Sequence, residues 1–220
     1  MPFIRIHRKV ARAAFGHVNR LHNLNLDPGG YLDNIAPDRQ KPGHGYDVPT
    51  NSGNIVDLIL LNFHALEIWL ARIDSREAQG KAQICFRYIC HCLADAFSLG
   101  QISREFWGKY DDAMDFMGEF VSIPDPVEEI INKYEFPGIV GAQGAEAFIR
   151  DMIYNTYSLF GEKAKKNKLK FIVSEDYREM VRREVWLSVP VAVALFDLAM
   201  LGARERKACR ECRSNPIRCC

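Results

Sequence analysis

Apolar residues recur at intervals of three and four along most of this chain, and this periodicity constrains the fold more than any other feature. Over residues 3–25 they fall mostly on one face of a helix, and the same spacing returns after each break. β-branched alternation is confined to residues 169–173. The sequence therefore predicts an all-α fold, a bundle of six or seven helices. The predicted helices span residues 3–25, 54–73, 76–99, 103–121, 127–134, 145–166 and 176–201.

The composition is that of a soluble globular domain. The 220 residues are 48% hydrophobic and 26% charged, and the formal net charge of +1 argues against a nucleic-acid partner. The most apolar stretch, residues 185–201, contains Pro190 and Asp197, so we expect no transmembrane segment. The start of the chain lacks the apolar core of a secretory signal, and the seven cysteines form no disulfide framework. These features predict a cytoplasmic protein.

A long segment rich in Pro, Gly, Asp and Asn, residues 26–53, separates the first two predicted helices. It opens on an Asp-Pro-Gly-Gly turn at residues 27–30. Structureless loops of this length are uncommon in compact domains and are usually functional. The segment carries Asp38 and His44, so it can bring an oxygen and a nitrogen ligand over the end of a bundle.

The predicted helices carry metal-ligating side chains in pairs. His91 and Asp95 are four residues apart, which places them on one helix face, one turn apart. Their nitrogen and oxygen atoms are ligands of the kind that Zn²⁺ accepts. Asp115 and Glu119 repeat the spacing on the fourth helix, and His7 opens the first. A buried hydrogen bond between His91 and Asp95, without any metal, remains the alternative.

In this order the residues resemble the zinc-dependent phospholipase C family, whose fold is shared with the fungal single-strand zinc nucleases. The resemblance covers roughly residues 3–120. It rests on a first-helix histidine, a loop Pro-Asp, a loop histidine followed by an aromatic residue and Asp, and a helical His-xxx-Asp. It implies a helical fold with up to three zinc ions and hydrolysis of phosphodiesters by a metal-bound hydroxide. The matching residues are His7, Asp38, His44, His91 and Asp95.

Two positions depart from the family pattern. Six residues after Asp95, where the family has histidine, this chain has Gln101. On the next helix it has Asp115-xxx-Glu119 in place of His-xxx-Glu. The exchange of nitrogen for oxygen favours Mg²⁺, Mn²⁺ or Ca²⁺ over zinc at that position, or leaves it empty. The resemblance thus implies one to three ions, with Asp38 orienting or deprotonating the attacking water.

Three functions stay open on these residues. The first is a metal-dependent phosphodiesterase that acts on a phospholipid or a related small ester. The second is a degenerate member that has lost metals and serves as a binding or structural module, which Gln101 and Asp115 favour. The third is a nuclease for single strands, which requires an aromatic stacking surface beside the metals.

The end of the chain is a separate prediction. We expect a helical metal-binding domain over residues 1–202 and a fraying, loose tail over 203–220, which has six basic and two acidic side chains. Cys209-x-x-Cys212 and Cys219-Cys220 offer thiolates for a structural zinc, with free thiols or lipidation as alternatives. Basic side chains beside cysteines also suit peripheral contact with anionic lipids.

Overall fold

The computed structural model confirms the predicted all-α class. It describes residues 4–30, 45–106, 117–118, 120–123, 141–166 and 168–214, and these contain six α-helices. A 3-10 turn and two short strands also occur in this part of the chain. The elements are α1 (Ile4–His22), β1 (Tyr46–Asp47), η2 (Val48–Thr50), β2 (Ser52–Gly53), α3 (Ile55–Leu70), α4 (Arg76–Ala96), α7 (Gly141–Lys166), α8 (Lys168–Ile172) and α9 (Glu175–Ser214).

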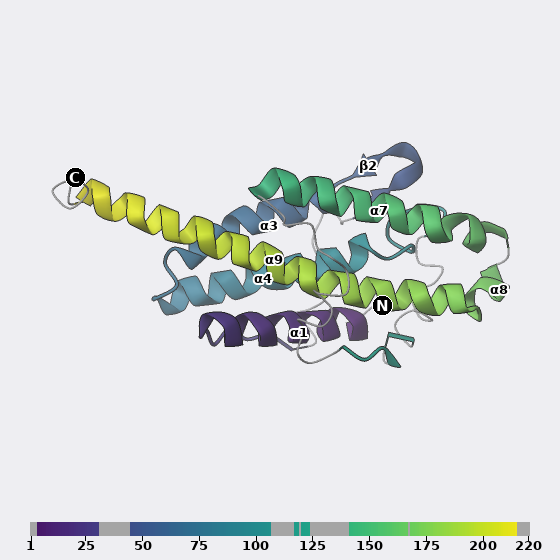
Figure 1. Ribbon diagram of the computed structural model, residues 1–220, viewed down its shortest axis with the longest axis horizontal. Helices are drawn as coiled ribbons and strands as arrows, with labels where there is room; N and C mark the ends of the chain where they lie inside the picture. Colours follow the sequence, from purple (N-terminus) through teal and green to yellow (C-terminus); the bar gives the residue numbers. More distant parts are fainter. Residues whose placement is uncertain are drawn as a thin grey trace.

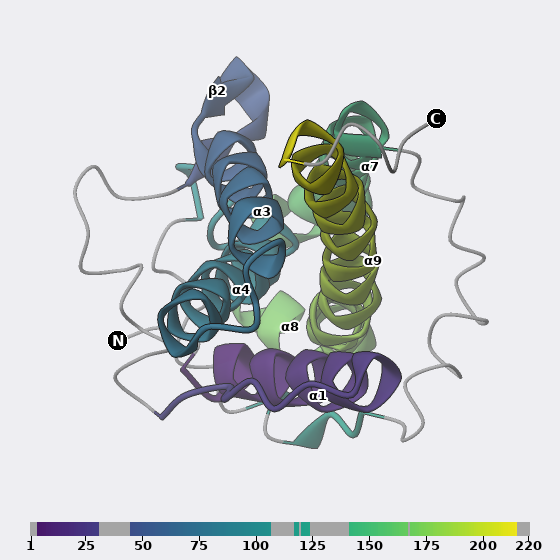
Figure 2. The same cartoon turned by 90° about the vertical axis from the view of Figure 1, so that its left-hand side faces the viewer.

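Helix α4 packs against α1, α3 and α9, and this arrangement organises the core (Figure 2). Helix α9 also packs on α1 and α3, and α7 lies alongside it (Figure 1). Three buried aromatic rings join the helices: Phe86 of α4 lies 4.7 Å from Phe15 of α1 and 4.8 Å from Phe196 of α9, between ring centroids. These contacts make α1, α4 and α9 one continuous core.

The C-terminal end of α4 is buried on every side. Its N-terminus is capped by Ser75, whose side chain accepts a hydrogen bond from the backbone N–H of Ala78 at 3.1 Å. From residue 89 to residue 96 every side chain is buried. Polar side chains in this stretch are therefore removed from water and must find partners within the protein.

The prediction that residues 26–53 form a structureless loop is partly wrong. Residues 31–44 lie outside the described residues, but β1 and β2 form an antiparallel hairpin around η2. The turn holds Asn51 in the left-handed region at φ 47°. Gly53 has a φ of 140°, and a Cβ there would lie 2.3 Å from the carbonyl oxygen of Gly45. Turn chemistry thus produces a hairpin where we expected an irregular loop.

The hairpin is fixed to the turn that follows α4. The backbone N–H groups of Tyr46 and Val48 donate to the carbonyls of Gln101 and Ile102, at 3.2 and 3.0 Å. Residues 103–106 form part of the same turn region, so the predicted helix over 103–121 does not begin at its expected residue. Much of that helix and all of the one predicted over 127–134 lie outside the described residues.

Helix α7 begins earlier than predicted. The predicted helix begins at residue 145, but α7 begins at Gly141, so that Gly141 and Gly144 both lie in its first turns. A glycine inside a helix costs about 1 kcal/mol relative to alanine. Burial of Ala145 and Ile149 on the same helix offsets this cost through tertiary packing.

Helix α9 continues without a break across the boundary expected at residue 202. A Cβ at Gly202 would lie 2.4 Å from Oε1 of Glu67, so glycine here permits close packing of α9 on α3. The next turn is held by Arg206, whose Nε lies 2.7 Å from the same Glu67 oxygen. Residues 203–214 are therefore an extension of α9, which projects past the other helices (Figure 1).

By length and composition alone, one helical segment of the described chain, Glu175–Cys209, is long and apolar enough to cross a membrane, where we expected none. Its most apolar window is 61% buried inside the protein. The core helix of a bundle has the same properties, so this segment is weak evidence for a membrane span.

Candidate metal centre

Three polar side chains meet between α1 and α4. Nε2 of His7 lies 3.0 Å from Oδ1 of Asp95, and Nε2 of His91 lies 3.1 Å from Oδ2 of the same carboxylate. The two imidazole rings are 3.9 Å apart between centroids. All three side chains are only 1–2% exposed. One carboxylate therefore bridges two histidines in a water-poor part of the core.

Helical geometry explains this placement. The spacing of four residues puts His91 and Asp95 one turn apart on the buried end of α4. His7 lies on the buried face of α1, beside the core residues Ile6 and Val10. Packing of α1 on α4 then joins side chains that are 88 residues apart in sequence.

A short segment covers α1 beside the cluster. A Cβ on Gly118 would lie 2.3 Å from Cγ1 of Ile6, so this position accepts only glycine without a shift of the neighbouring side chain. Nζ of Lys9 donates to the carbonyls of Gly118 and Val121 at 2.7 and 2.6 Å. These contacts fix the chain around residue 118 next to the helical turn that carries His7.

The geometry fits a metal ion with small adjustments. Zinc bound by nitrogen and oxygen at about 2.0–2.1 Å in a tetrahedron keeps its ligand atoms roughly 3.3 Å apart. The candidate ligand atoms of His7, His91 and Asp95 all lie within 4.8 Å of one another. Two imidazoles and one carboxylate are a donor set that Zn²⁺ accepts, and a fourth position remains for water or another ligand. This group could therefore hold a metal ion.

Two buried thiols of α4 are not part of the candidate metal group. Cys85 and Cys90 are buried in the wall of α4. Burial raises the pKa of the Cys90 thiol far above its usual value and raises that of Cys85 to about 11. In the absence of a metal ion, both thiols therefore stay protonated at neutral pH.

The structure brings together three of the eight predicted site residues. Asp38, His44, Asp115 and Glu119 lie outside the described residues, so their predicted roles stay predictions. Gln101 is half-buried, and the hydrogen bonds shown for it are made by its backbone to Tyr46 and Ser98 rather than to the cluster.

Sequence reasoning missed a buried carboxylate in the hairpin. Asp47 is 5% exposed and accepts hydrogen bonds from Oγ1 of Thr50 at 2.5 Å and from the backbone N–H of Arg104 at 2.9 Å. Burial alone would raise the pKa of this carboxyl, but the two hydrogen bonds outweigh it and hold the pKa below its usual value. The Asp-x-x-Thr spacing was the one local signal, and it indicates a turn rather than a catalytic group.

A second histidine–aspartate pair was also missed. Nε2 of His22, the last residue of α1, lies 2.6 Å from Oδ1 of Asp197 on α9. The His22 side chain is 12% exposed and that of Asp197 is 39% exposed. The residues are 175 positions apart, so no sequence spacing could join them.

Comparison of the chain with protein-family models, with curated proteins and with solved structures gives no match. The class of site, a buried His-His-Asp group able to hold a metal ion within an all-α bundle, therefore rests on the chain's own geometry.

Proposed function

We propose that this protein is a metal-dependent phosphodiester hydrolase similar to the zinc-dependent phospholipase C family, with an ion held by His7, His91 and Asp95. One observation carries the proposal: the first-helix histidine and the helical His-xxx-Asp pair, far apart in sequence, share one carboxylate in space. The resemblance implies that His7 and Asp95 share a metal site, and their contact supports this part of it. The predicted approach of His44 and Asp38 to His91 lies outside the described residues. The proposed substrate class is a phospholipid or a related small phosphodiester.

When bound, an ion of the zinc type supplies a Lewis acid and lowers the pKa of coordinated water to about 7. His7 and His91 are positioned to hold it through their Nε2 atoms as neutral imidazoles. Asp95 contributes a negative charge that offsets a divalent cation in a dry environment. Because the three side chains are nearly inaccessible to water, their electrostatic interactions are strengthened. Asp38 remains the proposed base.

Burial supports a second candidate, a non-catalytic module of the same fold. In that case Asp95 accepts one Nε2–H from each histidine, which satisfies the carboxylate inside the core without any metal. The group then clamps α1 onto α4 and needs no access for a substrate.

Metal content tests both the proposal and this alternative. We expect the purified protein to retain about one zinc-type ion per chain in elemental analysis after dialysis. His91→Ala and Asp95→Ala should each abolish it. His64→Ala is the matched control, because His64 is 55% exposed and pairs with Glu67 on α3. If the wild-type protein contains no metal, or if the two variants retain it, the metal site is contradicted. The group would then serve only to hold α1 against α4.

Activity separates the substrate classes. The metal-loaded protein should hydrolyse a chromogenic phosphocholine diester, and His91→Ala should not. Equal or faster digestion of single-stranded DNA would instead favour the nuclease. Bound metal without hydrolysis of either substrate would contradict the enzyme and support a metal-binding module.

A further inference from the structure

A cavity of about 280 Å³ lies between α9 and the segment around residues 117–122. Its apolar lining includes Phe120, Val181 and the indole of Trp186. The indole is fixed, because its Nε1–H donates to the carbonyl of Ser122 at 2.9 Å. Lys9 anchors the opposite wall by its hydrogen bonds to backbone carbonyls of the same segment. The cavity therefore has a preformed aromatic wall, as small-molecule sites commonly have.

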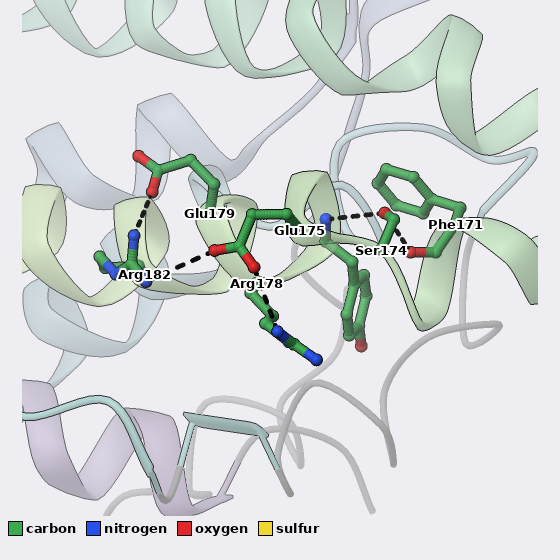
Figure 3. Close-up of polar contacts among 7 residues, drawn as sticks. Phe171, Ser174, Glu175, Arg178, Glu179 and Arg182 are labelled. Carbon is green, nitrogen blue, oxygen red and sulfur yellow. Dashed lines mark hydrogen bonds and ion pairs between the residues drawn. The ribbon is translucent and has the colours of Figure 1, made fainter.

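Two arginines supply the charge of the cavity. Arg178 and Arg182 are four residues apart on α9 and both line it. Their acidic partners, Glu175 and Glu179, do not line the cavity. Glu175 pairs with Arg178 at 3.1 Å and with Arg182 at 3.9 Å, and Glu179 pairs with Arg182 at 2.6 Å (Figure 3). Each guanidinium has five N–H donors, and the ion pairs with Glu175 and Glu179 do not use all of them, so donors remain for a ligand.

The combination specifies a type of ligand. Paired guanidinium groups match the charge and the several acceptor oxygens of a phosphate monoester, which they can bind in a bidentate manner. The apolar wall requires a hydrophobic group on the same molecule. A volume just below the usual range for small-molecule sites suits one or two fused rings or a short chain, not a complete lipid tail.

We propose that this cavity binds a phosphate monoester with a small apolar group, with the phosphate on Arg178 and Arg182 and the apolar group against Trp186 and Val181. This site uses none of the metal-cluster residues and does not depend on hydrolysis. The segment that lines the cavity also packs on α1 beside the turn that carries His7, but no residue of α1 lines the cavity itself.

Calorimetric titration with 1-naphthyl phosphate tests the proposal. EDTA is included, so that a failure of the metal proposal cannot affect the result. We expect 1-naphthol, which lacks the phosphate, and inorganic phosphate, which lacks the rings, each to bind at least about tenfold more weakly. Similar affinity for 1-naphthol would overturn the phosphate site, and so would the absence of binding by 1-naphthyl phosphate.

Charge variants identify the binding groups. Arg178→Gln and Arg182→Gln should each weaken binding of 1-naphthyl phosphate by about tenfold or more, because each removes charge-assisted hydrogen bonds. Both side chains are largely at the surface, at 55% and 39% exposure, so the variants should fold. Arg206→Gln is the matched control on the same helix, since its guanidinium pairs with Glu67 outside the cavity. Unchanged binding in both test variants would contradict the assignment.

A variant of opposite sign excludes a merely structural effect. Glu179→Gln removes the closer of the two acids that compete for Arg182, so it should tighten binding by about two- to threefold while leaving the aromatic wall intact. Weaker binding in this variant would mean that the ion pairs of α9 shape the cavity rather than compete with its ligand.

Discussion

Helix α1 carries a histidine–aspartate contact at each end. The two contacts join the same chemical groups but differ in length and in burial. Near its start, His7 meets Asp95 of α4 at 3.0 Å with both side chains almost fully buried. At its end, His22 meets Asp197 of α9 at 2.6 Å with the aspartate more than one-third exposed. The shorter contact is thus the more exposed one. Distance alone does not indicate which pair can form a functional site.

Burial and a third ligand separate the two ends. At the His7 end, His91 lies on the other oxygen of the carboxylate, which completes a set of three donors. At the other end, the neighbours of His22 and Asp197 in a shallow cavity of about 350 Å³ include Leu21, Met200 and Arg204, whose cation opposes binding of a metal ion. Of the two ends, the His7 end therefore has a group that could hold a metal ion, and the His22 end has a partly exposed contact between α1 and α9.

The largest effect should come from Asp95→Ala. This change leaves two buried imidazoles without their shared acceptor, so we expect the free energy of unfolding to fall by about 3–5 kcal/mol. Urea denaturation in EDTA measures it without any contribution from metal. A fall below about 1 kcal/mol, the value expected for an exposed pair, would remove the distinction between the two ends.

A bound metal ion should stabilise the folded protein only through the buried His7 end of α1. A free zinc concentration 100 times the dissociation constant should raise the free energy of unfolding by about 2.7 kcal/mol. We expect this gain in the wild type and in His22→Ala, and its loss in His91→Ala. Denaturation with and without zinc measures the gain, and an equal loss in the His22 variant would show that the ends had been assigned wrongly.

Gly118→Ala tests how closely the segment around residue 118 packs on α1 beside His7. Its methyl group would displace the buried Ile6, so we expect a destabilisation of about 1–3 kcal/mol. Gly80→Ala is the matched control, because a Cβ there meets nothing within 4 Å inside α4 and should stabilise by about 0.5–1 kcal/mol. Thermal unfolding of both variants measures the contrast, and two changes of the same sign would contradict it.

The smallest effect should come from Asp197→Ala. Since this carboxylate is 39% exposed, we expect a loss of no more than about 1 kcal/mol. Urea denaturation measures the loss, and a fall of about 3 kcal/mol or more, the value expected for a buried pair, would mean that this end is buried in solution.

Most of the helices and two of the three cluster residues were predictable because their signals are local. Periodic apolar residues identify α3 and α4, and a four-residue spacing identifies His91 with Asp95. The contact of His7 was expected only from resemblance, since no spacing encodes a separation of 88 residues. His22 and Asp197 had no signal at all, because tertiary packing alone brings them together.

The boundaries that failed were those where tertiary contacts outweigh local propensity. Gly144 and Gly202 are helix breakers by propensity, yet each lies inside a helix. At Gly202 the reason is visible in the close approach of Glu67. The hairpin depended on Asn51 and Gly53, whose conformations a count of turn-forming residues does not specify.

The uninterrupted course of α9 has a mechanical consequence. With 40 residues and a rise of about 1.5 Å each, it is a rod of roughly 60 Å that runs from the arginine-lined cavity through the core to an exposed basic tip. Pro190 lies within this helix and has no backbone N–H to donate, so it marks the position at which such a long helix can bend. A change in direction there would move the tip relative to the arginine-lined cavity without breaking the helix in two.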